Sequence, residues 1–534
     1  MRVGPGSVAP ATAVAVAPPT GTRGVARQST LSGSVATLAL GAGLLLDVAA
    51  AAAFGAGRDT DAFVAAARLP LAGTAVLLLL GNQVLVPTFA TWAVTLEARR
   101  MRRLVTGTLL AAVGIGAALA LALGALGPLL ARVLAPGFDA EQTALTASLL
   151  WVMVWTLPLA AGCEVLRSWF NARAQVVVPA AMTVVMNLVA AGLVLTWPGD
   201  VRVLPLAYVV GSACQLLLVL AWAVVRGFRV ARPRWRDPEL VALPRLLARP
   251  STAAGLNPLA RVAETAIASF LAPGSATVLH YGNRLVSAVG GTVLFRSVMV
   301  AVLPRLTRAQ VAGRRDEAAA LATLGLRLMV AVSLPLTALT VVLAVPGVEL
   351  LFGLGRFGES DARLLGLCVV VLALSFPASA VQRALLAPYY AARDTRVPLR
   401  NAVVGVAVDL ALLPVAVLPL LGTGYEVLGV AAAFVAGNVA NVVHAHHCLV
   451  RSELPRPRLD AAALRGSVLG ALAVAAAAGA AWALGGGLAP LLPGSALRLV
   501  VAGAAGVVVL VLTVVVQRRA SGGGRHRRTG GAGS

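Results

Sequence analysis

The sequence has little charge and few acidic residues. Of its 534 residues 12% are charged and 59% are hydrophobic, and 21 acidic residues stand against 44 arginines. The mean hydropathy is +0.88, well above what a water-soluble protein with a polar surface tolerates. The composition excludes a soluble globular domain and indicates a protein that lies in a lipid bilayer.

Cysteine, lysine and the common catalytic motifs are also rare or absent. The four cysteines are isolated, so the sequence indicates neither a disulfide framework nor a Cys-x-x-Cys site. There is no lysine, and no His-Glu-x-x-His, Gly-x-Ser-x-Gly or Walker motif. These absences argue against an enzyme, and we expect a transporter that needs no cofactor.

What the sequence does contain is a long series of apolar runs. Each has about twenty residues, which as a helix crosses a hydrocarbon core of roughly 30 Å. We therefore expect an all-α polytopic membrane protein with about fourteen transmembrane helices. The predicted spans lie near residues 30–54, 62–93, 104–134, 143–166, 175–197, 203–225, 251–272, 277–303, 319–345, 364–387, 397–421, 427–450, 461–485 and 495–517.

Arginine-rich connections alternate with arginine-poor ones along the chain. The rich ones follow every second span, as at Arg99–Arg103 and Arg226–Arg249, whereas the others are short and carry one or two arginines. The positive-inside rule then predicts a multi-pass membrane protein with an even number of spans and both termini in the cytoplasm. This topology accounts for the net charge of +23. We therefore expect membrane lipids, and no nucleic acid, as partners of the basic loops.

The predicted spans fall into two bundles. Residues 29–226 are expected to form an N-terminal six-helix bundle and residues 251–450 a C-terminal one, joined by a basic cytoplasmic linker, residues 227–250. Two such bundles around a central cavity are typical of transporters that rock about a midplane site. Residues 451–517 add two further transmembrane helices, and residues 1–28 and 518–534 are predicted to be disordered cytoplasmic tails.

Charged residues inside apolar spans are candidates for function, because a charge in lipid is costly unless it is paired or hydrated. Arg261 and Glu264 are three residues apart and could neutralise each other on one helix face. Arg284 has no acidic residue three or four positions away, so it either meets a partner on another helix or faces an aqueous cavity. Asp47 and Asp409 could equally form helix-to-helix hydrogen bonds. The full set is Asp47, Asp61, Arg68, Glu164, Arg261, Glu264, Arg284, Arg296 and Asp409.

A cluster of histidines near the end of the twelfth span could in principle bind metal. His444, His447 and Cys448 fall on one helix face. Such a cluster beside Arg451 at a cytoplasmic helix end is more often an interfacial group, and we expect no metal site.

A set of short motifs occurs in the middle of the chain. The segment from Ala301 to Ala362 contains Leu-Pro, Gly-x-x-Asp-Glu, Leu-Arg-Leu, a second Leu-Pro, and a Leu-Phe-x-x-Gly-x-Phe run that ends at Phe357. The segment LAPYYAARDTRVP follows, with the form Tyr-Ala-x-x-Asp-Thr-x-x-Pro. Together these motifs resemble the MurJ/MviN family of lipid II flippases, part of a superfamily that includes polysaccharide exporters and multidrug antiporters. The resemblance covers roughly residues 30–450.

The resemblance also implies a set of substrate-binding residues. Arg284 of YGNRL matches the cavity arginine of the family, Thr277 a small hydroxyl position, and Asp61 the aspartate of a Thr-Asp-Ala-Phe motif. The complete candidate set is Arg284, Asp61, Thr277, Arg68, Arg261 and Glu264. The arginines of the family's first span are missing, and Thr74 and Ala75 occupy the places of its paired second-span arginines. Arg261 or Arg296 could supply positive charge from another helix.

The function implied by the resemblance is the transport of a lipid-linked peptidoglycan precursor across the bacterial cytoplasmic membrane by alternating access. The polar head of such a polyprenyl diphosphate glycan cannot cross hydrocarbon unaided, and arginine suits a diphosphate because its guanidinium makes forked hydrogen bonds. Cell-wall synthesis proteins could be partners. The alternatives are an exporter of another polyprenyl-linked polysaccharide, a drug or organic-cation antiporter that would use Asp47, Asp61 and Glu264, and an inactive scaffold paralogue.

The polar segment Arg383–Asn401 is predicted to be a cytoplasmic hinge loop. Pro388 and Pro398 would end the flanking helices, and Arg393 and Asp394 would hold the turn. A loop whose arginines only set the topology is the alternative.

Overall fold

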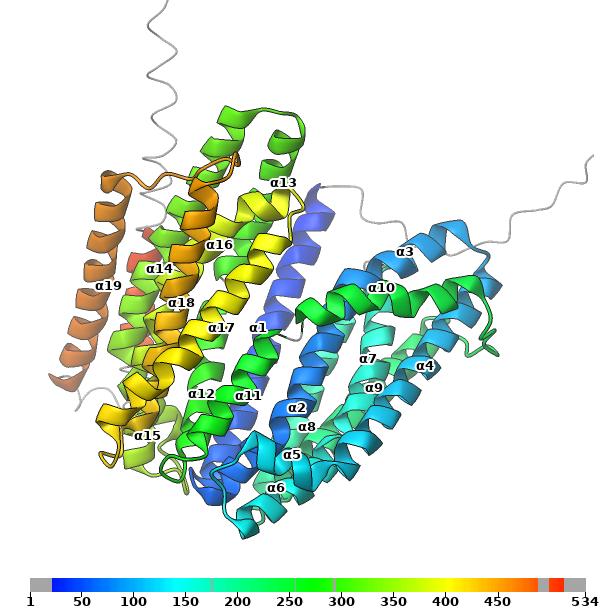
Figure 1. Ribbon diagram of the computed structural model, residues 1–534, viewed down its shortest axis with the longest axis horizontal. Helices are drawn as coiled ribbons and strands as arrows, with labels where there is room; N and C mark the ends of the chain where they lie inside the picture. Colours follow the sequence, from blue (N-terminus) through cyan, green and yellow to red (C-terminus); the bar gives the residue numbers. More distant parts are fainter. Residues whose placement is uncertain are drawn as a thin grey trace, which may run out of the picture.

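The molecule consists of two helical lobes that lie side by side, with α1 (Thr22–Phe54) between them (Figure 1). The computed structural model describes residues 22–173, 175, 177–254, 256–291, 294–487 and 499–512, and the regular elements over these residues are helices. The N-lobe contains α1, α2 (Arg58–Leu80), the π-helix η1 (Gly81–Leu85), α3 (Val86–Thr95), α4 (Ala98–Ala125), α5 (Gly127–Leu134), α6 (Ala140–Met153), α7 (Thr156–Asn171), α8 (Val177–Thr196), α9 (Val203–Val225) and α10 (Pro238–Ala254).

The C-lobe begins directly after α10. It contains α11 (Leu256–Ala268), α12 (Ser275–Val286), the π-helix η2 (Ser287–Gly291), α13 (Leu294–Val311), α14 (Arg315–Phe352), α15 (Glu359–Ala373), α16 (Ser375–Ala391), α17 (Arg396–Val417), the short 3₁₀ helix η3 (Leu418–Leu420), α18 (Glu426–Val450) and α19 (Ala461–Gly487). One apolar core runs through both lobes and includes Leu46 of α1, Phe63 of α2, Leu279 of α12 and Phe352 of α14.

The apolar runs of the sequence fold as membrane-length helices. Within the described residues, ten helical segments are long and apolar enough to cross a membrane, and two shorter apolar helices cover Ala181–Thr196 and Leu499–Leu512. The all-α membrane architecture is therefore confirmed. The count of about fourteen spans is not, because α11 and α12 have only 13 and 12 residues, short of the roughly 20 that a full crossing needs.

The predicted linker is largely helical and packs against the N-lobe. Trp92 of α3 donates its indole N–H to Glu239 of α10 at 3.0 Å, and Arg100 of α4 pairs with Asp237 at 2.9 Å. Leu243 of α10 is buried in the second apolar core of the N-lobe. The Arg100 guanidinium, which donates two hydrogen bonds to Asp237, holds the pKa of this carboxyl below its ordinary value.

The structure describes part of the predicted N-terminal tail and none of the predicted C-terminal tail. Because α1 begins at Thr22, residues 22–28 of the N-terminal tail are helical. Residues 1–21 and 518–534 lie outside the described residues. Of the two added C-terminal spans, the first is α19, which lies along α14.

The arginine-rich connections gather at one end of the molecule. In Figure 1 the turn between α13 and α14 and the connection between α18 and α19 lie at the top, and α3 and α10 lie towards the same end of the N-lobe. At the opposite end lie α5, α6 and the start of α15. This arrangement is the one that the positive-inside rule requires.

Candidate functional site

A cavity of about 390 Å³ lies between the two lobes. It is bounded by α1, α2 and α8 on one side and by α11, α12 and η2 on the other, and we call it the interlobe cavity. Its charged lining consists of Arg68, Arg261, Arg284 and Asp47, with His280 beside them. Three of the predicted substrate-binding residues are therefore brought together here.

Arg284 is held in this wall by a carboxylate of the other lobe. Its Nε lies 2.7 Å from Oδ2 of Asp47, which is buried in α1, and its Nη1 lies 3.5 Å from the Tyr208 hydroxyl of α9. The sequence left two alternatives for Arg284, a partner on another helix or an aqueous cavity. The structure contains both, because the pair forms part of the cavity lining.

Arg68 of α2 has no such partner. Its Nε and Nη2 atoms are buried without a hydrogen-bond partner in the described part of the chain. An unsatisfied charged donor is costly, so this guanidinium is a group that a ligand in the interlobe cavity could satisfy.

Arg261 of α11 stands between the interlobe cavity and a second one. Its Nη1 donates to Glu264 at 2.8 Å and to Oδ1 of Asn283 at 2.7 Å, and its guanidinium carbon lies 4.5 Å from the centre of the Phe434 ring. The predicted pairing of Arg261 with Glu264 is confirmed. Arg296, the other predicted source of charge, belongs to a stretch of α13 whose side chains are outside the described ones.

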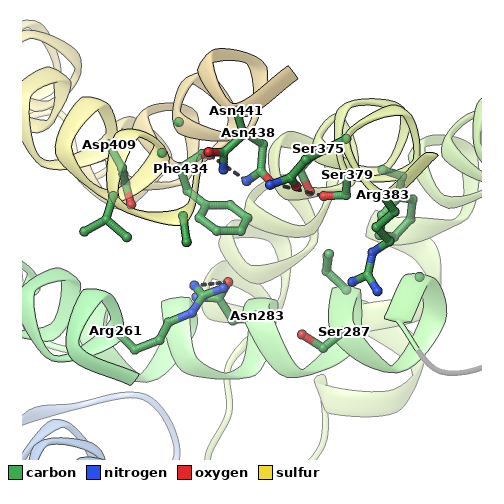
Figure 2. Close-up of a pocket in the computed structure, with 18 of the residues that line it drawn as sticks. Arg261, Asn283, Ser287, Ser375, Ser379, Arg383, Asp409, Phe434, Asn438 and Asn441 are labelled. Atoms are coloured by element: carbon green, nitrogen blue, oxygen red, sulfur yellow. Dashed lines mark hydrogen bonds between the residues drawn. The ribbon is translucent and has the colours of Figure 1, made fainter. Parts of the chain in front are cut away.

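The second cavity has a volume of about 500 Å³ and lies within the C-lobe, between α11, α12 and η2 on one side and α16, α17 and α18 on the other. We call it the C-lobe cavity. Figure 2 shows Arg261 and Asn283 on one side of it, with Asp409 and Phe434 opposite. The two cavities share Arg261, Asn283 and Ser287 in their linings.

Arg383 lines the C-lobe cavity, although the sequence predicted it to lie in a loop. It was assigned to the hinge loop, but α16 continues to Ala391 with Pro388 inside it, and Arg383 lines the C-lobe cavity (Figure 2). The prediction that Pro388 ends the helix is wrong, because a proline costs a transmembrane helix little where neighbours satisfy the freed carbonyl. The Pro388 carbonyl keeps its helical hydrogen bond, because it accepts from the Ala392 N–H at 3.0 Å as well as from Gln310 of α13 at 3.3 Å. The apolar pattern through residues 384–387 was the available signal.

The turn that follows α16 contains the predicted hinge residues. Arg393 has a positive φ of 60°, and Oδ1 of Asp394 accepts a hydrogen bond from the Arg396 N–H at 2.9 Å. Pro398 lies in the first turn of α17 and lines the C-lobe cavity. Pro398 thus lies near the start of a helix beside a cavity, and the hinge role of these residues stays a prediction.

Asp61 and Thr277 are brought together, but line neither cavity. Oδ1 of Asp61 accepts hydrogen bonds from the Thr277 N–H at 2.8 Å and its hydroxyl at 2.6 Å, and Oδ2 accepts one from the Gly274 N–H at 2.7 Å. Both side chains are buried, at 3% and 0% exposure. The carboxylate of α2 thus caps the N-terminus of α12, and a contact of this pair with substrate stays a prediction.

Two further contacts join the lobes at the same, arginine-poor end. The Arg356 N–H donates to the Ala52 carbonyl at 2.9 Å, and the Gly137 N–H donates to the Ser269 hydroxyl at 2.9 Å. We call these contacts and the Asp61 cap the interlobe joint. The joint keeps the two lobes together at the end opposite to the arginine-rich connections.

The histidine cluster of α18 makes hydrogen-bonding contacts. His444 lies 3.2 Å from Nδ2 of Asn401 and 3.5 Å from the Cys448 sulfur. Among the described residues no group of three or more His, Cys, Asp or Glu side chains is placed to hold a metal ion.

Among curated proteins, the chain is similar to relatives named as lipid II flippases. Two curated relatives named "Probable lipid II flippase MurJ" are 30% identical over 210 residues, from Rhizobium meliloti (strain 1021), and 26% identical over 205 residues, from Vibrio cholerae serotype O1. The first match covers 39% of this chain and 39% of the relative, and the second 38% of each. The matched part is therefore about two-fifths of the length of these relatives.

Solved structures share the fold over a much larger part of the chain. A lipid II flippase MurJ in an inward closed conformation has a TM-score of 0.73 at 16% identity, and the match covers 92% of this chain and 99% of that one. A MOP superfamily transporter from Pyrococcus furiosus has a TM-score of 0.56 at 13% identity, with 80% and 95% covered. A family model described as "Lipid II flippase MurJ" matches residues 50–501. The resemblance seen in the motifs is therefore confirmed, and this multi-pass membrane protein belongs to the lipid II flippase MurJ family.

Proposed function

We propose that this protein moves lipid II, or a closely similar polyprenyl diphosphate glycan, across the bacterial cytoplasmic membrane by alternating access of the interlobe cavity. It acts as a transporter, with no bond made or broken in the substrate. Membership of the MurJ family supports the substrate class. The arrangement of two lobes about a shared cavity supports the mechanism.

The observation that carries the proposal is the excess of arginine in the interlobe cavity. Three arginines line it, Arg68, Arg261 and Arg284. Arg284 is paired with Asp47 and Arg261 with Glu264, so the guanidinium of Arg68 is the excess charge. Charges in a confined, partly dehydrated space interact more strongly than in water, so the cavity favours an anion. A diphosphate fits because each guanidinium offers paired donors to phosphate oxygens.

These arginines supply charge that the family pattern places elsewhere. Thr74 and Ala75 stand where relatives have paired arginines, and Thr74 donates its hydroxyl to the Leu71 carbonyl of its own helix. Arg68, six residues earlier on α2, and Arg261 on α11 both line the cavity. The chain thus retains a cationic cavity with a different set of donors.

The interlobe joint supports a direction for the movement. The lobes are held together at the arginine-poor end, which is the outer end under the positive-inside rule. Outward release then requires that the Asp61 cap on α12 and the Arg356 contact with Ala52 break. During this step the apolar tail of the substrate stays in the lipid, and only the polar head uses the cavity.

The acidic residues that could have favoured a cationic cargo are already bound. Asp47 pairs with Arg284, Glu264 with Arg261, and Asp61 with the N-terminus of α12. No carboxylate in the described lining of the interlobe cavity is left without a cationic partner. This geometry weighs against a drug or organic-cation antiporter.

Complementation of a bacterium depleted of its own flippase tests the proposal. We expect the wild-type chain to restore growth and the exposure of lipid II on the outer face, measured by an externally added enzyme that cleaves it. Arg284→Ala should fail, whereas Arg363→Ala, which removes an exposed arginine of α15 outside both cavities, should succeed. Correct membrane insertion of the wild-type chain without exposed lipid II would refute the proposal.

A further inference from the structure

We propose that the C-lobe cavity is a second subsite, which receives an uncharged sugar ring of the substrate while the diphosphate lies in the interlobe cavity. This inference rests on the proposed function and adds to it the place of the glycan. Four features of this cavity support it: its charge balance, its hydrogen-bonding groups, its size and its position.

The charges that line the C-lobe cavity cancel. Arg261 and Arg383 contribute two positive charges, and Glu264 and Asp409 contribute two negative ones. Arg261 and Glu264 also neutralise each other directly. A cavity with this balance has no preference for an anion or a cation, and it suits a polar ligand without net charge.

The hydrogen-bonding groups of the cavity are of both kinds and are only partly used. Ser379 donates to Oδ1 of Asn438, and Nδ2 of Asn438 donates to the Phe434 carbonyl, but an amide can form more bonds than these. Oδ1 of Asp409 and Nδ2 of Asn283 are buried without a hydrogen-bond partner among the described residues. The residues that carry them are only 4% and 9% exposed.

A sugar ring matches such a set because each hydroxyl both donates and accepts. One hydroxyl can therefore satisfy the acceptor of Asp409, and another the donor of Asn283. Unsatisfied buried groups of this kind each cost free energy until a ligand or water meets them. The ring of Phe434 contributes an apolar surface between these polar groups (Figure 2).

The size and position of the cavity agree with this assignment. Its volume of about 500 Å³ is within the roughly 300–1,000 Å³ that small-molecule sites have. The shared lining by Arg261, Asn283 and Ser287 makes it adjacent to the interlobe cavity. In a polyprenyl diphosphate glycan the first sugar is bonded directly to the diphosphate, so a ring can enter beside Arg261 while the phosphates remain near Arg284.

Binding measurements with two lipids test the assignment. The purified full-length protein is titrated with lipid II and with a polyprenyl diphosphate of equal chain length, which has the same tail and diphosphate but no sugar. Asn438→Leu removes hydrogen-bonding capacity from the C-lobe cavity. We expect it to weaken lipid II binding about three- to tenfold and to leave polyprenyl diphosphate binding unchanged, whereas Arg284→Ala should weaken both.

Asn82→Leu is the matched control. Asn82 donates to the Leu78 carbonyl four residues earlier, just as Asn438 donates to Phe434, but it is exposed on η1 and lies outside both cavities. Its substitution should change neither affinity. Thermal unfolding shows whether each variant is folded. If Asn438→Leu does not fold, Ser379→Ala takes its place in the test.

The outcomes separate the two proposals. A wild-type protein that binds neither lipid refutes the proposed function and this inference together. A wild-type protein that binds lipid II, with a folded cavity variant that loses both lipids equally or neither, overturns the sugar subsite alone and leaves the flippase proposal standing.

Discussion

The two cavities differ in how they use arginine. In the interlobe cavity the arginines outnumber the carboxylates, and Arg68 has buried nitrogens without a partner in the described part of the chain. In the C-lobe cavity the charges balance, and the described groups left unsatisfied are two amides, of Asn283 and Asn441, and the carboxylate of Asp409. The chain has 44 arginines, most of which set its topology. What marks an anion site is therefore an arginine that faces a cavity without an equal number of acids, and the number of arginines alone is uninformative.

The cavities also differ in what moves around them. The interlobe cavity is bounded by both lobes, so its shape depends on how the lobes are joined. The C-lobe cavity is bounded by helices of one lobe and should keep its shape when the lobes move. Four substitutions test these differences, in order of decreasing effect.

Removal of Arg284 should have the largest effect. Arg284→Ala leaves Asp47 as a buried charge without its partner, which typically costs about 3–5 kcal/mol, and here the lower end because 34% of the Arg284 side chain is exposed. The rate of lipid II transport should fall by about tenfold to a hundredfold, because a charge-assisted hydrogen bond to the substrate is lost. Thermal unfolding and the exposure of lipid II measure the two effects.

The double variant Asp47→Ala/Arg284→Ala separates these effects. It removes both charges, so stability should recover while transport stays low. Recovery of transport together with stability would mean that Arg284 serves the fold and does not bind substrate.

Strain in the interlobe joint should alter one cavity and spare the other. Gly355 has a φ of +66°, and a Cβ there would meet the Ala52 carbonyl of α1. Gly355→Ala should therefore push the lobes apart and change the labelling rate of a cysteine introduced at Ala39, in the interlobe cavity, but not at Ser379, in the C-lobe cavity. The experiment uses a chain whose four native cysteines are replaced.

Gly422→Ala is the control for this strain. Gly422 has a φ of +76°, but nothing lies within 4 Å of its added Cβ, so the backbone cost of about 1–2 kcal/mol appears without the clash. Equal labelling changes in both variants, or a change at Ser379, would argue against a joint that controls only the interlobe cavity.

Replacement of Arg68 should increase the stability of the protein and reduce its transport rate. Arg68→Met removes the unsatisfied nitrogens and keeps the length of the side chain, so the free energy of unfolding should rise by about 1–3 kcal/mol. Transport should fall several-fold because the cavity loses a phosphate donor. A less stable variant would show that the guanidinium has a partner in the protein, and unchanged transport would remove it from the site.

Loss of the surface pair Arg100–Asp237 should have the smallest effect on stability. It is the reference against which the loss of the buried pair Arg284–Asp47 is compared. Arg100→Ala should lower the stability only slightly, because an exposed ion pair is screened by water and salt. The pKa of Asp237 is lowered in the folded protein, so the stabilisation is present above the ordinary pKa of aspartate and is lost as the pH falls through the lowered value. The difference in thermal unfolding between wild type and variant should therefore be full at neutral pH and should shrink as the pH falls below the ordinary pKa of aspartate, about 3.9.

Much of the fold could be predicted because the lipid bilayer constrains the sequence strongly. A helix in lipid must be apolar over about twenty residues, and this requirement leaves a clear signal. The spans predicted at residues 203–225, 397–421 and 427–450 agree closely with Val203–Val225, Arg396–Leu420 and Glu426–Val450. The pairing of Arg261 with Glu264 could also be predicted, since it is local to one helix face.

The contacts between distant segments could not be predicted in this way. Asp61 and Thr277 are 216 positions apart, and neither residue differs locally from one that faces a cavity. Arg383 was assigned to a loop because a proline lies five residues after it, although α16 continues through Pro388. For Asp61 and Thr277 the tertiary environment decides whether a polar group is satisfied, and the local sequence does not record it. For Arg383 the apolar residues 384–387 were a local signal that the helix continues.

A structure of the full-length protein with bound lipid II, determined by electron cryomicroscopy, tests the central claim most directly. The account predicts diphosphate density in the interlobe cavity, within hydrogen-bonding distance of Arg284 and Arg68, with the first sugar beside Arg261. Diphosphate density inside the C-lobe cavity, or a head group that lies outside both cavities, would contradict it.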